Sequence, residues 1–279
     1  MVAVTLMWSI ASVVTRQLEA ARSFEITFWR SFFTVASLLV ILPFVQGRQV
    51  FGKILHGGPA LWISGLCWSV MFTAFMVALT LTTVANVLVT MAVAPFLTAL
   101  LARIFIGHRI PARTWLAILL AGGGISYMYG AQVSGGQLAG TLVAFCVPLA
   151  SAINWTLTQR SHAAGQDVDL VPAVLFGAVL SSLYTLPLAW PLQASPHDIG
   201  WLALLGLVQL AIPCSLAVAC ARVLKAPEIS LLSLLEVIFG IVLVWIGAGE
   251  APSATVLVGG SLVIGALVVN ELVGWRQRA

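Results

Sequence analysis

Apolar stretches of about twenty residues recur along the whole sequence, separated by short segments that hold most of the charged residues. Each stretch is long enough to cross the hydrocarbon core of a bilayer as an α-helix, which needs roughly 20 residues. The strands of a membrane β-barrel would be about ten residues long and would alternate in polarity, and these stretches do neither. The pattern therefore predicts an all-α integral membrane protein.

Glycine and proline at the ends of the apolar stretches mark the predicted boundaries of the spans. The first stretch is not interpreted as a signal peptide, because no basic residue precedes it and similar stretches follow. Whether a leader precedes Met1 is left open. The ten predicted transmembrane helices cover residues 1–20, 24–46, 59–80, 83–106, 113–130, 138–160, 170–191, 199–221, 227–248 and 253–273.

The composition excludes several classes of protein. Hydrophobic residues make up 61% of the chain and charged residues 8%, against roughly 45–50% and about 25% in soluble domains. This excludes a soluble enzyme, a nucleic-acid binder and a disordered chain. The cysteines lie in apolar stretches without metal-ligand spacing, the histidines lie in separate connections, and no nucleotide-binding or catalytic motif occurs. We expect no cofactor, no metal and no nucleic-acid partner.

The positions of Lys and Arg predict the orientation, because these residues accumulate on the cytoplasmic side. With ten spans and a cytoplasmic amino terminus, ten of the 13 Lys and Arg residues fall in inner connections. The outer side then holds only Arg16, Arg22 and Arg30. We therefore predict a multi-pass protein of the bacterial inner membrane with both termini in the cytoplasm.

A shift of 142 positions aligns the fourth and fifth spans with the ninth and tenth without gaps. The identities are Leu101 with Leu243, Ile104 with Ile246, Gly107 with Gly249, and Gly123 with Gly265. Each half would hold five spans, and an odd number forces the second copy to enter the membrane inverted, as in many secondary transporters. Chance similarity between apolar helices is the alternative. We predict two inverted five-helix repeats, residues 1–133 and 134–279.

The order and spacing of several short motifs resemble the drug/metabolite transporter superfamily, EamA type. The resemblance implies ten helices in two inverted halves, a central cavity and alternating access, and export of metabolites, amino acids or drugs; one branch, the YddG-like proteins, exports aromatic amino acids. Val237 departs from the proline usual after the glutamate, and His108 departs from the usual glutamate. The motifs are Leu6-Met7-Trp8-Ser9, Phe28-Trp29-Arg30, Ala78-Leu79, Thr83-Val84-Ala85-Asn86, Ala94-Pro95, Gly107-His108-Arg109, Leu231-Leu232-Ser233-Leu234-Leu235-Glu236 and Gly249-Glu250.

Polar and aromatic side chains inside the predicted spans indicate a binding site, because a polar group facing lipid is costly. Packing between helices is the alternative for each hydroxyl and amide, and filling of the core is the alternative for the tryptophans. Glu236 is the only carboxylate near the centre of a predicted span. The predicted substrate-binding residues are Trp8, Ser12, Trp68, Phe72, Asn86, Thr90, Asn154, Trp155, Gln209, Ser233 and Glu236.

Four further residues are candidates for gating or for outer-end charge. Arg16 and Arg30 lie one to two turns from the predicted outer surface, where snorkelling to the interface explains them; pairing with a substrate carboxylate is the other interpretation. Pro95 and Pro213 lie within predicted spans, and each should kink its helix.

The leading hypothesis is a secondary transporter that exports small amphipathic metabolites, above all amino acids with aromatic or other hydrophobic side chains. The two halves would rock around a central midplane cavity. Proton coupling through Glu236 and facilitated export are both left open, as are the exact substrate and a monomeric or homodimeric state. A drug or organic-cation exporter of the same superfamily is the alternative. A membrane-embedded enzyme is disfavoured, because the one central acid has no catalytic partner at its depth. A channel, which would carry fluxes without saturation or counterflow, is also disfavoured.

Overall fold

The computed structural model describes residues 1–21, 23–47, 49–55, 57–107, 110–130, 138–163, 169–249 and 251–276. Regular secondary structure within these ranges is helical throughout. Seven of the described helices are long and apolar enough to cross a membrane, and two shorter apolar stretches cover Val2–Val14 and Ala254–Asn270. The chain is therefore a multi-pass α-helical membrane protein, while the count of ten spans stays a prediction.

The helices begin and end close to the predicted boundaries, but several predicted spans are divided into two or three elements. In chain order the elements are α1 (Val2–Ser9), α2 (Ala11–Val14), η1 (Thr15–Gln17), α3 (Ser23–Gln46), α4 (Val50–Leu55), α5 (Pro59–Leu81), α6 (Val84–Met91), α7 (Ala94–Ile106), α8 (Ala112–Tyr129), α9 (Leu138–Ala163), α10 (Val171–Ala189), α11 (Pro196–Leu204), η3 (Leu205–Ala211), α12 (Ile212–Cys220), α13 (Ala226–Ser233), α14 (Leu235–Ala248) and α15 (Ala254–Arg276).

The divisions have local causes in the sequence. Pro95 follows the turn between α6 and α7, and Pro213 follows the π-helical segment η3. Proline has no N–H to continue the helical hydrogen bonds, so the distortions predicted at these residues are present. The Ser233 hydroxyl donates to the Ile229 carbonyl at the end of α13, and such bonds from Ser or Thr often bend helices.

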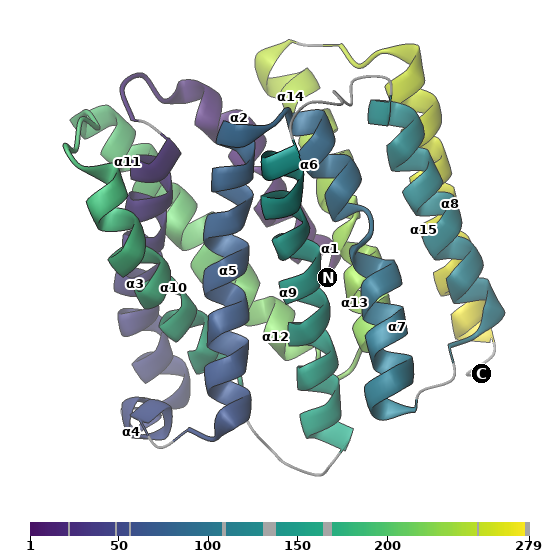
Figure 1. Cartoon of the computed structure of the whole chain (residues 1–279), viewed down its shortest axis with the longest axis horizontal. Helices are drawn as coiled ribbons and strands as arrows, with labels where there is room; N and C mark the ends of the chain where they lie inside the picture. Colours follow the sequence, from purple (N-terminus) through teal and green to yellow (C-terminus); the bar gives the residue numbers. More distant parts are fainter. Residues whose placement is uncertain are drawn as a thin grey trace.

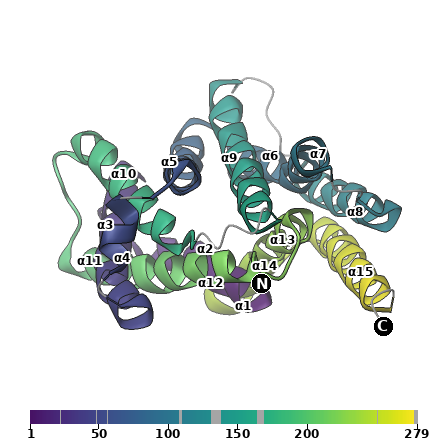
Figure 2. The ribbon, with the colours of Figure 1, turned by 90° about the horizontal axis from the view of Figure 1, so that it is seen from below.

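Helices from the two ends of the sequence interlock. Figure 1 shows the bundle from the side, and Figure 2 shows α5, α9, α7 and α8 along one side with α12, α1, α14 and α15 along the other. The most extensive packing joins α5 to α9, α8 to α15, α10 to α5, and α10 to α3. Each of these pairs unites one helix before residue 131 with one after residue 137. The halves are therefore interlaced, and their rocking during transport stays a prediction.

Close packing of α8 on α15 depends on two glycines. A Cβ atom at Gly124 would lie 2.8 Å from the Gly259 carbonyl oxygen, and a Cβ atom at Gly259 would lie 2.6 Å from the Gly124 carbonyl oxygen. Small residues let membrane helices approach closely, and these two glycines bring the backbones of α8 and α15 together. Gly123 and Gly265 face open space instead.

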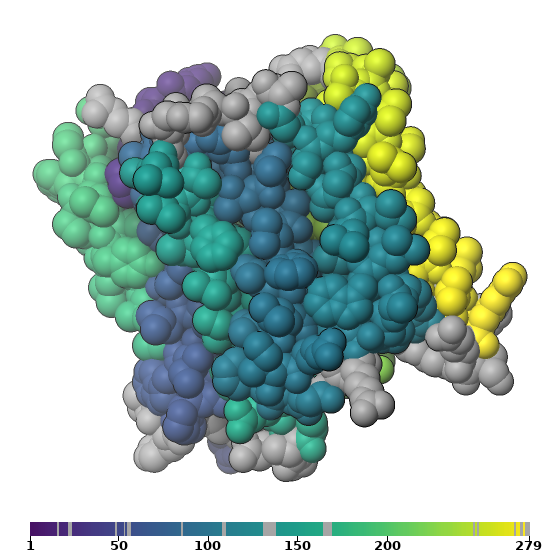
Figure 3. Space-filling model, turned by 45° about the vertical axis from the view of Figure 1, so that its right-hand side comes forward, coloured from purple at the N-terminus to yellow at the C-terminus, as the bar shows by residue number. Residues whose placement is uncertain are grey.

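The outer surface of the bundle is apolar. Figure 3 shows the face to which α7, α8 and α15 contribute. These helices expose large apolar side chains, among them Phe105, Leu119 and Val269. Contact of these side chains with lipid tails costs no free energy, whereas their exposure to water is unfavourable. The surface therefore agrees with the composition in requiring a bilayer.

Two buried carboxylates hold the loops at one end of the bundle. The Asp198 carboxylate, fully buried at the start of α11, accepts hydrogen bonds from the backbone N–H groups of residues 19, 20 and 21. The Glu25 carboxylate in α3 accepts from the backbone N–H groups of Gln193 and Ala194. Each acid therefore belongs to one half of the chain and holds a loop of the other half.

Candidate functional site

A charged cluster inside the bundle draws on helices from both halves. Arg30 of α3 lies within electrostatic range of Glu236 in α14 and of the Cys214 thiol in α12. The indole of Trp8 in α1 lies within hydrogen-bonding reach of Cys214. The structure thus gathers a cation, an acid, a thiol and an aromatic ring at one place.

Arg30 is held at this place by very close packing between α3 and η3. A Cβ atom at Gly206 would lie 2.9 Å from the Arg30 carbonyl oxygen, so only glycine allows this approach of the two backbones. The Thr34 hydroxyl donates to the Arg30 carbonyl at 2.8 Å and to the Gly206 carbonyl at 3.1 Å. These contacts fix the depth of Arg30 in the bundle.

The guanidinium of Arg30 is only 3% exposed, and its Nε is buried without a hydrogen-bond partner. Snorkelling to the membrane surface is therefore wrong for this residue. A buried cation is costly unless it is paired and hydrogen-bonded. Because its Nε has no partner, the guanidinium retains capacity to bind an anion. The side chain of Arg16 lies outside the described residues.

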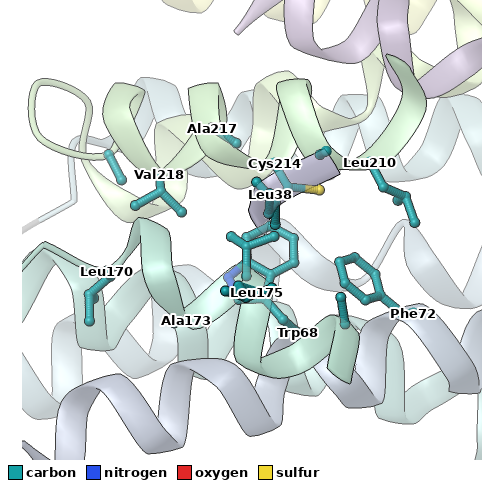
Figure 4. Packing of buried hydrophobic residues seen from close by; sticks show 14 of the residues in the cluster. Leu38, Trp68, Phe72, Leu170, Ala173, Leu175, Leu210, Cys214, Ala217 and Val218 are labelled. Carbon is teal, nitrogen blue, oxygen red and sulfur yellow. The ribbon is translucent and has the colours of Figure 1, made fainter. Parts of the chain in front are cut away.

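Aromatic rings form one wall beside the charged cluster. The ring centroid of Trp68 lies 5.6 Å from that of Phe72 and 5.8 Å from that of Trp155. Figure 4 shows Trp68 and Phe72 facing Cys214 and Leu210 from the opposite layer. Their burial agrees with a role in filling the core. Their position facing Cys214 agrees with a role in binding. Their role in binding stays a prediction.

Two buried amides near this wall have unused hydrogen-bonding capacity. The Ser64 hydroxyl donates to Asn154 Oδ1 at 2.7 Å, while Nδ2 of Asn154 is buried without a partner. Oε1 of Gln209, in η3, is also buried without a partner. π-Helical segments such as η3 occur frequently at functional sites. Buried polar groups left unsatisfied cost free energy, so both amides stay candidates for contact with a substrate.

The polar residues predicted on α6 form local bonds. Asn86 donates from Nδ2 to the Thr82 hydroxyl at 2.7 Å, and the Thr90 hydroxyl donates to the Asn86 carbonyl at 2.6 Å. Ser12 and Ser233 likewise donate to carbonyls of their own helical segments. Bonding of this kind is the packing alternative for these four residues, although the Ser12 hydroxyl also lies 3.4 Å from the Gly240 carbonyl oxygen of α14, one turn after Glu236.

Cys214 is the member of the cluster that sequence reasoning missed. Its place in an apolar stretch predicts only a small packing residue, because a cysteine there usually is one. Only its position opposite Arg30 and Trp8 distinguishes it, and that position depends on the fold. Among the described residues, no group of three His, Cys, Asp or Glu side chains is placed to hold a metal ion.

Comparison with known proteins gives a consistent result. The family model of the EamA-like transporter family matches residues 1–130 and 138–271. The pseudopaline exporter CntI from each of two strains of Pseudomonas aeruginosa is 24% identical over 251 residues, covering 88% of this chain and 84% of the relative. A solved structure, described only as a crystal structure of a protein, superposes with a TM-score of 0.81 at 18% identity and covers 97% of this chain and 95% of the other.

Proposed function

Because the chain belongs to the EamA-like transporter family, we propose that it exports small amphipathic metabolites that carry a carboxylate, with amino acids as the first candidates. Membership in this family indicates a transporter. The similarity to a pseudopaline exporter supports the outward direction of transport.

The buried guanidinium of Arg30 is the observation that carries this proposal. Arginine binds a carboxylate through two parallel hydrogen bonds, and the unpartnered Nε of Arg30 leaves this geometry available. Glu236 lies nearby with the opposite charge, which suits the ammonium group of a zwitterion. The rings of Trp8, Trp68 and Phe72 would contact the apolar part of the substrate.

An exporter of organic cations is the second candidate, and Glu236 with the aromatic rings is the observation that favours it. Aromatic faces and an acid attract cations. Arg30 opposes this alternative, because a buried positive charge repels a cationic substrate. A zwitterionic substrate would pair with both Arg30 and Glu236, so we prefer it to a cation.

We further propose ten spans in two inverted repeats, alternating access around the charged cluster, and an inner-membrane location with both termini in the cytoplasm. The two matched segments of the family model and the excess of Lys and Arg in the predicted inner connections support this arrangement. Because the helices of the two halves interlock, the moving bodies would each combine helices of both repeats.

Counterflow in liposomes tests the proposed function. Purified protein is reconstituted into vesicles loaded with one member of a panel of zwitterionic amino acids, their decarboxylated amines and organic cations, and uptake of a labelled trace of the same compound is followed. We expect saturable exchange of amino acids with apolar side chains and little exchange of the amines. Exchange of the amines alone would establish the cation exporter, and flux without saturation would indicate a channel.

Glu236 is the candidate for proton coupling. In Glu236→Gln we expect counterflow to persist with a higher concentration for half-maximal exchange, because the ammonium group loses its counter-charge. We expect transport driven by a proton gradient to lose its stimulation, because glutamine cannot exchange a proton. The exposed acid Glu19 provides the matched control, Glu19→Gln, which should respond to the gradient as the wild type does. Gradient-driven transport that is unchanged in Glu236→Gln would assign the protein to facilitated export.

A further inference from the structure

We propose that Trp68 and Asn154 form a second polar subsite of the transporter, which binds an oxygen acceptor on the apolar part of the substrate. The preferred substrates are then amino-acid derivatives whose side chain carries a carbonyl or a second carboxylate. The proposal rests on the proposed function for the binding of the first carboxylate at Arg30, and its test is read separately from that assignment.

Two hydrogen-bond donors are buried between α5 and α9 without an acceptor. Trp68 is 3% exposed and Asn154 is fully buried. Neither Nε1 of Trp68 nor Nδ2 of Asn154 has a hydrogen-bond partner among the described residues. An indole N–H and an amide NH₂ group are donors and cannot accept. Because a buried donor without an acceptor costs free energy, each such group in a folded protein needs an explanation, and a bound ligand is one.

The packing of α5 on α9 brings the two donors to the same region of the interface. The Ser64 hydroxyl donates to Oδ1 of Asn154 at 2.7 Å, so Asn154 lies beside the turn of α5 that contains Ser64. Trp68 lies four residues later on the same face of α5, and long side chains of a helix point back toward its amino terminus over the preceding turn. The ring of Trp68 also contacts that of Trp155, the neighbour of Asn154, with 5.8 Å between the centroids.

Contacts with neighbouring residues hold both donors in place. A Cβ atom at Gly177 of α10 would lie 2.5 Å from Cβ of Trp68 and 2.7 Å from the Gly65 carbonyl oxygen, so α10 lies directly against α5 at this point. The hydroxyl of Ser64 occupies Oδ1 of Asn154 and leaves the hydrogens of Nδ2 without a partner. Donors that are already fixed lose little conformational entropy when they bind an acceptor.

The chemistry of the pair determines which group it can bind. Uncharged N–H donors suit the oxygen of a carbonyl or a carboxylate, and they offer no acceptor to an ammonium group. A methyl or methylene group in the same place would leave the donors unsatisfied. A site built to hydrogen-bond a substrate rejects an analogue that lacks the bonding atom, so the pair should discriminate between substrates of equal shape.

The donors belong to the layer that faces the charged cluster. Figure 4 shows Trp68 opposite Cys214 of α12, and Cys214 lies within electrostatic range of Arg30. A substrate bound between the layers would present its first carboxylate to Arg30 and the oxygen of its apolar part to Trp68 and Asn154. An amino acid with a purely apolar side chain would use only the first of these contacts.

Two substrates that differ in a single oxygen test the subsite. The compounds para-acetylphenylalanine and para-isopropenylphenylalanine have nearly the same shape, but only the acetyl compound carries a carbonyl. In counterflow with the wild-type protein, we expect the acetyl compound to reach half-maximal exchange at a concentration lower by about fivefold for each hydrogen bond formed. The decarboxylated amines of both compounds are measured in parallel, so the effect of the oxygen is read in whichever class is exchanged.

Two variants remove the donors one at a time. Trp68→Phe keeps an aromatic ring but loses the N–H, and Asn154→Leu keeps the approximate shape but loses the amide. We expect each variant to reduce the ratio between the two half-maximal concentrations by about fivefold, whereas a merely structural role would affect both compounds equally and leave the ratio unchanged. Trp62→Phe is the matched control, because Nε1 of the exposed Trp62 already donates to the Gly57 carbonyl at 2.8 Å.

Equal half-maximal concentrations for the two compounds in the wild type would overturn the subsite and assign the donors to a bound water molecule. A preference that persists in both Trp68→Phe and Asn154→Leu would overturn it as well. Exchange of the amines alone, with the preference for the acetyl form retained, would support the subsite and contradict the proposed carboxylate site at Arg30.

Binding without transport is measured on the detergent-solubilised protein, because a ligand that binds the folded state raises its unfolding midpoint. We expect the acetyl compound to raise the midpoint of the wild type more than the isopropenyl compound does, and the difference to disappear in Trp68→Phe. Equal midpoints with the two compounds would overturn the subsite, while exchange of purely apolar amino acids in the counterflow panel would still support the proposed function.

Discussion

Replacement of Arg30 by leucine is expected to weaken transport of a carboxylate-bearing substrate by about 30-fold or more, because removing one partner of a buried charge pair costs about 2 kcal/mol or more. The loss should fall mainly on the concentration for half-maximal transport. Arg30→Lys should restore only part of the affinity, because lysine keeps the charge but lacks the planar guanidinium. Initial rates of counterflow over a range of substrate concentrations measure both effects.

The control for this prediction is Arg103→Leu, since Arg103 is exposed near the end of α7. Size-exclusion chromatography of the detergent-solubilised variants checks that each one folds. An Arg30→Leu protein that folds and binds its substrate with unchanged affinity would remove Arg30 from the binding site. An Arg30→Leu protein that exchanges cations better than the wild type would favour the organic-cation alternative.

Substitution of Gly124 by leucine is expected to separate α8 from α15 and to destabilise the protein strongly. The first side-chain atom would already lie 2.8 Å from the Gly259 carbonyl oxygen, which is backbone and cannot move aside alone. Overpacking costs about 1–3 kcal/mol and sometimes more, which should lower the midpoint of thermal unfolding by roughly 5 °C or more. Thermal unfolding in detergent, followed by size-exclusion chromatography, measures the change.

Gly123→Leu is the matched control for Gly124→Leu. It makes the same substitution one position earlier in the same helix, but a Cβ atom at Gly123 meets nothing within 4 Å. We expect its unfolding midpoint to equal or exceed that of the wild type, because leucine favours the helix more than glycine does. Equal destabilisation by both substitutions would show that the contact between Gly124 and Gly259 does not determine the packing of these helices.

Much of the fold could be predicted because lipid imposes a simple pattern on the sequence. The length and hydropathy of the apolar stretches were sufficient to predict an α-helical membrane protein. The helices α6, α9 and α10 begin within one residue of their predicted starts. The divisions inside spans were predictable where proline causes them, as at Pro95. The break between α13 and α14 carries no proline and was not predictable; the Ser233 hydroxyl donates to the Ile229 carbonyl there.

The site was harder to predict because it depends on which helices meet. Glu236 could be identified because its depth within one span follows from its position in the sequence. The burial of Arg30 depends on Gly206, which is 176 positions away in the chain, and near the end of a span its charge suggested the membrane surface instead. Asn86 and Thr90 stay predicted binding residues, although each also bonds within its own helical segment, which a sequence alone does not reveal.

The interlacing of helices from the two halves bears on how the protein is made. When α3, α5 and α8 emerge from the ribosome, the helices that will cover them, α10, α9 and α15, have not yet been synthesised. The side chains of Arg30 and Glu25 therefore lie in or beside the bilayer without their partners until the later helices have been translated. The interfaces of α3 and α5 can form only after α9 and α10 have been made, and that of α8 only after the last helix, α15. The amino-terminal half made alone would therefore have one side of each of these interfaces.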